Sequence, residues 1–292
     1  MKKYIISSVF AFILITQNVT AQGLYNQGAK IIVQNNANIV LTGSYTNLNQ
    51  AANNGEIELN GTIYIKGNFV NNASSGGIFI NRNTDGDVIF NGAGNSNISG
   101  TCADSILFEN VTVESSSTIT NNHLSSVKGD LTLIGANKNI TVGTGDLFVE
   151  GQIIGTDYSI TAVSTGYLAQ NAQTNVQKVF RLTNGSEDLT VAVTILNPAS
   201  RPIRAKLNTG KNVNTALITT FWDITGENDL NATLVLRLDK ILLGANTIPD
   251  NYLMRYYNGT RYIPIPQDRV NITDFSTYYQ ITLTEMNILS TL

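Results

Sequence analysis

The chain has 292 residues, enough for one large or two ordinary domains with a well-filled core. Its 18 basic and 21 acidic residues are nearly balanced, so the composition offers no positively charged surface for nucleic acid and excludes that class of partner. Only 13% of the residues are charged, and Asn, Thr, Ser and Gly are abundant, a composition found in many exported all-β proteins.

A secretory signal peptide is predicted at residues 1–21. Two lysines precede an apolar run over 4–15, and small residues at 19–21 supply a cleavage site before Gln22. The apolar run is shorter than the roughly 20 residues that a membrane span needs. We therefore expect export, with no membrane span once the signal is removed.

A five-residue module centred on a glycine recurs along the first half. Copies lie at Ile65–Phe69, Val127–Leu131 and Val149–Ile153, with a looser copy at Leu41–Tyr45 and a fragment at Phe90–Gly92. Each copy has apolar residues two positions either side of the glycine, so in an extended chain these residues and the glycine share one face. Most neighbouring copies are 22 to 25 residues apart, a period that predicts the turns of a β-solenoid.

The module also predicts where its glycines lie. Gly67, Gly129 and Gly151 are expected at equivalent inward positions, where the missing side chains make room for Phe69 and Leu131.

Strict alternation of apolar and polar residues over 57–69 predicts a strand, and short strands are expected through most of the first half. The further candidates are 30–34, 38–43, 77–80, 87–91, 105–113, 139–142 and 145–154. Pairs such as Asn-Gly and Gly-Gly separate them and supply turns.

A domain boundary is predicted after residue 166, giving a β-helix repeat domain at 22–166 and a β-sandwich at 167–292. All five prolines follow residue 166, and proline removes a donor from a sheet ladder. The second half has longer candidate strands, with a hairpin turn at Asn258-Gly259. These strands are Leu189–Leu196, Ala232–Leu238, Leu253–Tyr257, Arg261–Ile265 and Tyr278–Thr284.

Both halves contain segments that resemble exported proteins of Gram-negative bacteria with type IX secretion. In the first half the resemblance lies in Asn91–Gly94, Ile98–Gly100, Leu107–Val113 and Val127–Leu133, and in the second half in Phe221–Asp223, Leu234–Leu238, Tyr256–Tyr262 and Phe275-Ser276. It implies an all-β fold, with a right-handed parallel β-helix followed by an antiparallel β-sandwich, and it carries over no catalytic residues. Such cargo usually ends in a sorting domain, which we do not expect here, so periplasmic residence stands beside surface delivery.

Few residues suggest chemistry. His123 is the only histidine and is expected in a solvated turn, and Cys102, the only cysteine, is expected to be buried. Asp85 and Asp87 flank a glycine and are the candidates for a calcium ion, but Asp-Gly is equally an ordinary turn. We expect no catalytic residues, no other cofactor, and no enzymatic activity.

Tyrosines concentrate near the C-terminus, where the last 45 residues hold six of the 12. Tyr256, Tyr257 and Tyr262 on the predicted hairpin are the candidates for partner binding, because tyrosine buries a large area at little entropic cost. Cross-strand packing within the sandwich is the other interpretation, and it is the one that the sequence favours.

The sequence favours a non-catalytic exported scaffold or adhesin-like interaction module of the cell envelope, in the periplasm or at the cell surface. Its expected partners are envelope proteins or a surface glycan. One alternative is a periplasmic accessory or plug subunit of an outer-membrane secretion translocon. A further alternative is a carbohydrate-active β-helix enzyme.

Overall fold

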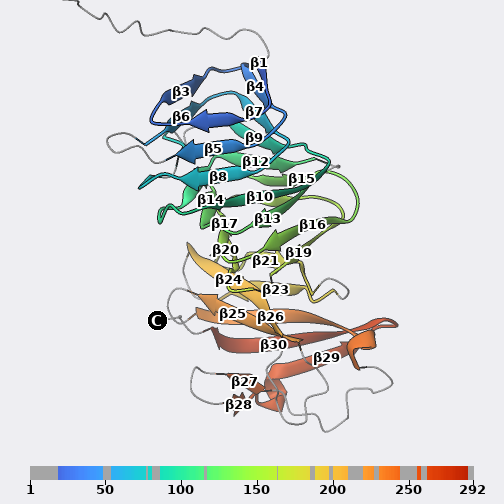
Figure 1. Ribbon diagram of the computed structural model, residues 1–292. Helices are drawn as coiled ribbons and strands as arrows, with labels where there is room; N and C mark the ends of the chain where they lie inside the picture. Colours follow the sequence, from blue (N-terminus) through green and yellow to red (C-terminus); the bar gives the residue numbers. More distant parts are fainter. Residues whose placement is uncertain are drawn as a thin grey trace, which may run out of the picture.

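The computed structural model describes most of the chain after residue 18. The described ranges are 19–48, 54–76, 78–80, 86–114, 117–162, 164–184, 188–196, 200–209, 220–226, 230–243, 255–257 and 262–288. Within them the chain is all-β, with about six turns of parallel β-solenoid followed by antiparallel sheets, which confirms the expected fold class (Figure 1). The lysines and apolar run of the predicted signal lie outside these ranges.

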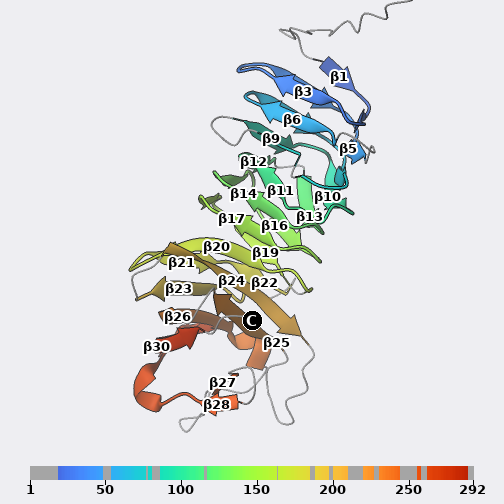
Figure 2. The same cartoon turned by 90° about the vertical axis from the view of Figure 1, so that its left-hand side faces the viewer.

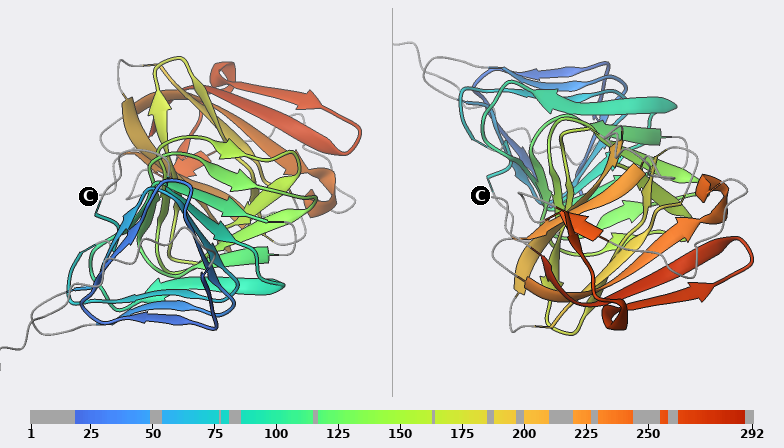
Figure 3. Two further views of the ribbon diagram at one scale, coloured as in Figure 1. Left: turned by 90° about the horizontal axis from the view of Figure 1, so that it is seen from above. Right: turned by 90° about the horizontal axis from the view of Figure 1, so that it is seen from below.

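The turns of the solenoid build three faces, which together enclose the interior when the molecule is viewed along its axis (Figure 3). The first sheet comprises β1 (Val19–Ala21), β4 (Asn38–Leu41), β7 (Thr62–Ile65), β9 (Asp87–Phe90), β12 (Asn110–Val113), β15 (Leu131–Leu133) and β18 (Ile153–Ile154). The second comprises β2 (Leu24–Asn26), β5 (Tyr45–Leu48), β8 (Phe69–Asn72), β10 (Gly94–Gly100), β13 (Ser117–Asn121), β16 (Lys138–Val142), β19 (Tyr158–Thr161) and β22 (Leu182–Thr183).

The third face begins with the paired strands β3 (Lys30–Val33) and β6 (Glu56–Leu59). It continues with β11 (Ile106–Phe108), β14 (Ser125–Val127), β17 (Leu147–Val149) and β20 (Leu168–Gln173), which we call the third sheet. Most turns contribute one strand to each face, but among the described residues the turn with β7 and β8 reaches the third face only through an isolated bridge between Phe79 and Ile57.

Parallel pairing places similar side chains on top of one another in the interior. Ile39 pairs with Ile63, and Ile63 with Val88, so one full turn takes 24 or 25 residues here. An aromatic column also runs through the interior: ring centroids are 4.9 Å apart for Tyr45 and Phe69, and 5.3 Å apart for Phe69 and Phe108. Such contacts add to the stabilisation from apolar burial.

The predicted strand over 57–69 is three strands. β6, β7 and β8 belong to three different faces, and the chain changes direction at 60–61 and at 66–68. The alternation nevertheless predicts the inward residues correctly, since every apolar residue at its odd positions is at most 4% exposed. Short corners preserve the alternation, so the pattern alone does not reveal them.

The repeated glycines lie at corners of two kinds. Gly67 joins the first sheet to the second, whereas Gly129 and Gly151 join the third sheet to the first. A Cβ atom on Gly151 would lie 2.2 Å from the carbonyl oxygen of Gly129, and one on Gly67 would lie 2.7 Å from the carbonyl carbon of Gly43. Gly129 and Gly151 are thus equivalent to each other, as expected, whereas Gly67 is not equivalent to them. The expected reason for the glycines is wrong, because Gly67 and Gly151 make room for the backbone of the preceding turn and Gly129 makes room for the Asn110 side chain.

Buried asparagines hold the corner that follows the second sheet. Asn26, Asn47 and Asn71 lie in register in three successive turns and are at most 2% exposed. The Asn47 and Asn71 amides donate to the carbonyl oxygens of Gly55 and Gly76, each at 3.1 Å. The asparagines thus satisfy backbone groups that would otherwise be buried without partners.

The third sheet continues without a break into the antiparallel half. β20 pairs in parallel with β17 on one side, and antiparallel with β24 (Ser200–Thr209) on the other, and β25 (Thr220–Gly226) follows β24. The hydrogen-bonded ladder therefore spans the predicted boundary after residue 166.

A second antiparallel sheet completes the C-terminal half and is consistent with the expected β-sandwich. It has the order β21 (Gln177–Phe180), β23 (Val191–Ile195), β26 (Leu230–Asp239), β30 (Tyr278–Ile288) and β29 (Val270–Asp274). The short 3-10 helices η1 (Lys240–Leu243) and η2 (Gln267–Arg269) and the hairpin β27 (Arg255–Tyr257) and β28 (Tyr262–Pro264) complete the described elements. The hairpin lies at the end of the molecule opposite β1 (Figure 2).

Replacing Gly151 with Ala is expected to lower the free energy of unfolding by about 1–3 kcal/mol, because the new methyl group collides with the backbone of the preceding turn. Lys128→Ser is the control, since this side chain is 44% exposed, and its effect should stay below about 0.5 kcal/mol. Urea denaturation measures both. Equal losses would contradict the role assigned to the corner glycines.

Replacing Asn71 with Leu keeps the side-chain volume but leaves the Gly76 carbonyl and the Ala73 N–H without this partner. We expect a loss of about 1–3 kcal/mol in unfolding free energy. Val70→Thr, on the outward side of the same strand, should change it by less than about 0.5 kcal/mol. An Asn71 variant as stable as the parent chain would show that the buried amide contributes nothing.

Candidate interaction site

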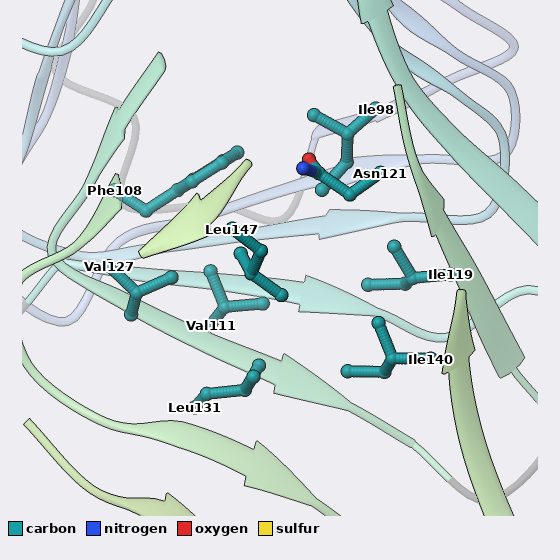
Figure 4. Close-up of a pocket in the computed structure, with 9 residues that line it drawn as sticks. All are labelled: Ile98, Phe108, Val111, Ile119, Asn121, Val127, Leu131, Ile140 and Leu147. Carbon is teal, nitrogen blue, oxygen red and sulfur yellow. The ribbon is translucent and has the colours of Figure 1, made fainter. Parts of the chain in front are cut away.

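The solenoid interior is too well packed to hold a ligand. The void between β12, β13 and β17 has a volume of about 10 Å³, no more than a single water molecule requires. Side chains from all three sheets converge on this void, among them Val111, Ile119 and Leu147 (Figure 4). Within the described turns, a ligand therefore has to bind on the outside of the solenoid.

The calcium candidates are only partly described. Asp85 lies outside the described residues, and Asp87 is half-buried at the start of β9, where its N–H donates to the Gly61 carbonyl at 3.0 Å. Among the residues that the structure describes, no three His, Cys, Asp or Glu side chains gather closely enough to hold a metal ion. The calcium site stays a prediction.

His123 is buried, so the expectation of a solvated turn is wrong. It is 5% exposed, and its Nδ1 and Nε2 atoms lie 2.9 and 2.8 Å from the carbonyl oxygens of Leu124 and Cys102. The imidazole thus ties one turn of the solenoid to the preceding turn. Cys102 is buried as expected.

The predicted hairpin is present as the pair β27 and β28, with Tyr257 opposite Tyr262 in the ladder. The side chains of these two tyrosines, and the turn at 258–261, lie outside the described part of the structure. Tyr256 is half-buried and packs against the core. Of the three partner-binding candidates, Tyr256 is therefore the one whose surroundings can be examined.

A pocket of about 260 Å³ opens beside Tyr256. Ile265 and Met286 are buried residues of its lining, and the other lining residues come from β27, β28, β30, η2 and the proline that precedes η2. The complete lining is Tyr256, Ile263, Pro264, Ile265, Pro266, Arg269, Glu285 and Met286. An apolar recess with a few polar groups is the usual form of a recognition site.

The polar groups of the pocket form an ion pair. The Arg269 Nη2 atom lies 3.3 Å from Glu285 Oε2, and Arg269 Nη1 donates to the Glu285 backbone carbonyl at 3.3 Å. The two side chains are 43% and 63% exposed, so the pair adds little to stability and can engage a partner.

Glu285 owes its position to a bulge in β30. The ladder between β26 and β30 shifts register between Ala232 and Leu234, and Glu285 has a φ of +54°. This left-handed conformation costs energy in a residue other than glycine, and both bulges and backbone strain are frequent at functional sites. No sequence pattern marks Arg269 or Glu285, because their pairing depends on the bulge.

A second polar cluster joins the last turns of the solenoid to β25. The Tyr167 hydroxyl donates to Asp223 Oδ2 at 3.0 Å, and the Tyr167 N–H donates to Asp146 Oδ1 at 2.8 Å. Arg204 Nη1 lies 3.5 Å from Asp146 Oδ2. Burial and then the neighbouring Asp223 carboxylate raise the pKa of Tyr167 well above its ordinary value. The position and contacts of this cluster indicate a structural joint.

Comparisons of the chain with protein-family models, with curated proteins and with solved structures found no match in any of the three. In the part of the chain that the structure describes, no helix is both long and apolar enough to cross a bilayer. The likeness to exported proteins of bacteria with type IX secretion thus stays a prediction, and the function of the site is argued from its own residues.

Replacing Tyr167 with Phe should lower the free energy of unfolding by about 1–2 kcal/mol at pH 8, because Asp223 loses a donor. The pKa of Tyr167 is higher in the folded chain than in the unfolded chain, so above pH 10 the unfolded chain loses this proton first. Deprotonation then stabilises the unfolded parent chain and lowers its free energy of unfolding, whereas the Phe variant has no such proton to lose. The difference should shrink by up to about 1.4 kcal/mol for each pH unit above 10. Denaturation at pH 8 and pH 11 tests this, and a constant difference would contradict it.

Proposed function

We propose that the chain is a non-catalytic, adhesin-like interaction module exported to the cell envelope, and that it holds an envelope protein at the pocket beside Tyr256. The observation that carries the proposal is the pocket itself, in which an apolar floor meets the exposed Arg269–Glu285 pair. Partner surfaces of this kind bury apolar and aromatic groups and use an arginine at the edge for specificity.

The architecture supports this role. The pocket lies at the far end of the molecule from β1, with the solenoid between them (Figures 1 and 2). The packed interior and continuous ladders make the solenoid a stiff support that separates the pocket from whatever lies near the N-terminal end.

The proposed location in the cell envelope rests on the predicted signal peptide and on the low content of charged residues, 13%. Protease digestion of intact cells distinguishes a surface location from a periplasmic one. Recovery in osmotic-shock fluid would favour the translocon accessory over the surface adhesin.

Charge reversal by Arg269→Glu tests the pocket. A photo-cross-linking residue at Pro266, on the exposed rim, should capture one discrete partner in cells, and Arg269→Glu should lower the yield roughly tenfold. Unfolding free energy should change by less than about 1 kcal/mol, because the pair is exposed.

The matched control is Lys30→Glu, which reverses an exposed charge that is 48% accessible and paired with Glu58 on the solenoid. Its cross-linking yield should equal that of the parent chain. Loss of the adduct in both variants, or no discrete adduct from the parent chain, would refute the pocket as the partner site.

A further inference from the structure

The outer side of the second sheet carries a regular array of short, uncharged, hydrogen-bonding side chains. These side chains form two columns, each with one residue on each of the strands β10, β13, β16 and β19. Residues of one column are paired between neighbouring strands, and the second column lies two residues earlier on each strand. The columns are Asn97, Thr120, Thr141 and Thr161, and Asn95, Thr118, Asn139 and Ser159; we call these eight residues the polar face. Sheet geometry spaces them about 4.8 Å apart along the solenoid axis and about 6.6 Å apart along each strand.

Side chains of the polar face are ordered by hydrogen bonds to one another. Asn95 Oδ1 accepts hydrogen bonds from the hydroxyls of Thr118 and Thr120, each at 3.2 Å. Asn139 Nδ2 donates to Thr161 Oγ1 at 2.9 Å and to Ser159 Oγ at 3.2 Å. Asn95 Nδ2 also donates to Thr120 Oγ1 at 3.0 Å, and Asn139 Oδ1 accepts from Thr161 Oγ1 at 3.2 Å. An amide has two donors and two acceptor lone pairs, so Asn95 keeps one donor and Asn139 one acceptor position for a ligand, and the ordered side chains lose little entropy on binding.

Charged residues are scarce on the strands that carry the polar face. The described strands of the second sheet contain one charged residue, Lys138, and its buried ammonium group donates to the carbonyls of Glu114 and Ser117. By contrast, β9 of the first sheet carries Asp87, and β6 carries Glu58. The eight residues of the polar face include no charged residue, which argues against a nucleic acid. They also include no aromatic residue or arginine, which argues against the core of a protein interface, although Arg181 lies beside the face, 4.6 Å from the centre of the Tyr158 ring.

We propose that the polar face binds an uncharged polysaccharide lying along the solenoid axis. Sugar hydroxyl groups both donate and accept hydrogen bonds, as do the amides and hydroxyls of the array. A linear polymer presents such groups periodically, and the face offers the same contacts in four successive turns. This activity is separate from the pocket beside Tyr256 and goes beyond the proposed function.

Affinity electrophoresis in native gels tests the proposal. The purified chain should be retarded in gels that contain at least one of the neutral polymers dextran, laminarin and xyloglucan, and not in gels that contain the anionic polymer alginate. Thr120→Glu should weaken the binding roughly tenfold, because its carboxylate would be desolvated against an uncharged ligand without a partner. Thr120→Val, which keeps the shape and removes the hydroxyl, should weaken it less.

Thr112→Glu is the matched control, since Thr112 is also outward and half-buried at mid-strand, but lies in the first sheet. It should bind as the parent chain does, and melting curves confirm that each variant is folded. Equal loss in the Thr112 variant, retardation by alginate alone, or no retardation in any neutral gel would overturn the proposal. If the chain adsorbed to growing ice and was not retarded in any neutral gel, the proposal would also be overturned, and the polar face would be a surface that binds ordered water.

Discussion

In-register parallel pairing is the constraint on which the rest of this structure depends. Neighbouring turns lie about 4.8 Å apart, so each residue sits directly above its counterpart in the preceding turn. A side chain that points along the axis meets backbone, and the corners at Gly67 and Gly151 therefore exclude even a methyl group. The same register repeats favourable contacts, such as the stacked aromatic rings and the asparagine ladder.

The sequence predicts the apolar sheets of the solenoid better than the polar one. Alternation identifies the inward residues of β6 and β7, because these strands place isoleucine and leucine inside. It misses β5 and β13, in which Asn47, Ser117 and Asn121 face inward and are fully buried. Their hydrogen bonds replace the apolar burial that the pattern detects. Corners are missed as well, since the bends at 60–61 and 66–68 preserve the alternation.

The residues of the site were hard to predict because several of them meet only through contacts between segments far apart in the sequence. The tyrosine-rich hairpin pointed to Tyr256, which lines the pocket, but Arg269 and Glu285 come together only through the bulge in β30. His123 follows two asparagines and resembles a turn in the sequence. In the structure, the stacking of turns places the Cys102 carbonyl beside its ring and so buries it. Contacts between turns are not encoded in any short window of residues.

The sharing of β20 between two ladders has a consequence for cooperativity. This strand is the last parallel partner of β17 and the first antiparallel partner of β24, so neither half of the chain has a complete sheet without it. A cut near residue 166 would leave β17 as an open edge and would detach β20 from the solenoid. Unfolding of the C-terminal half leaves an edge of the third sheet without its partner strand. Unfolding of the solenoid removes the sheet on which β20 and β24 are paired. We therefore expect the two halves to unfold as one cooperative unit.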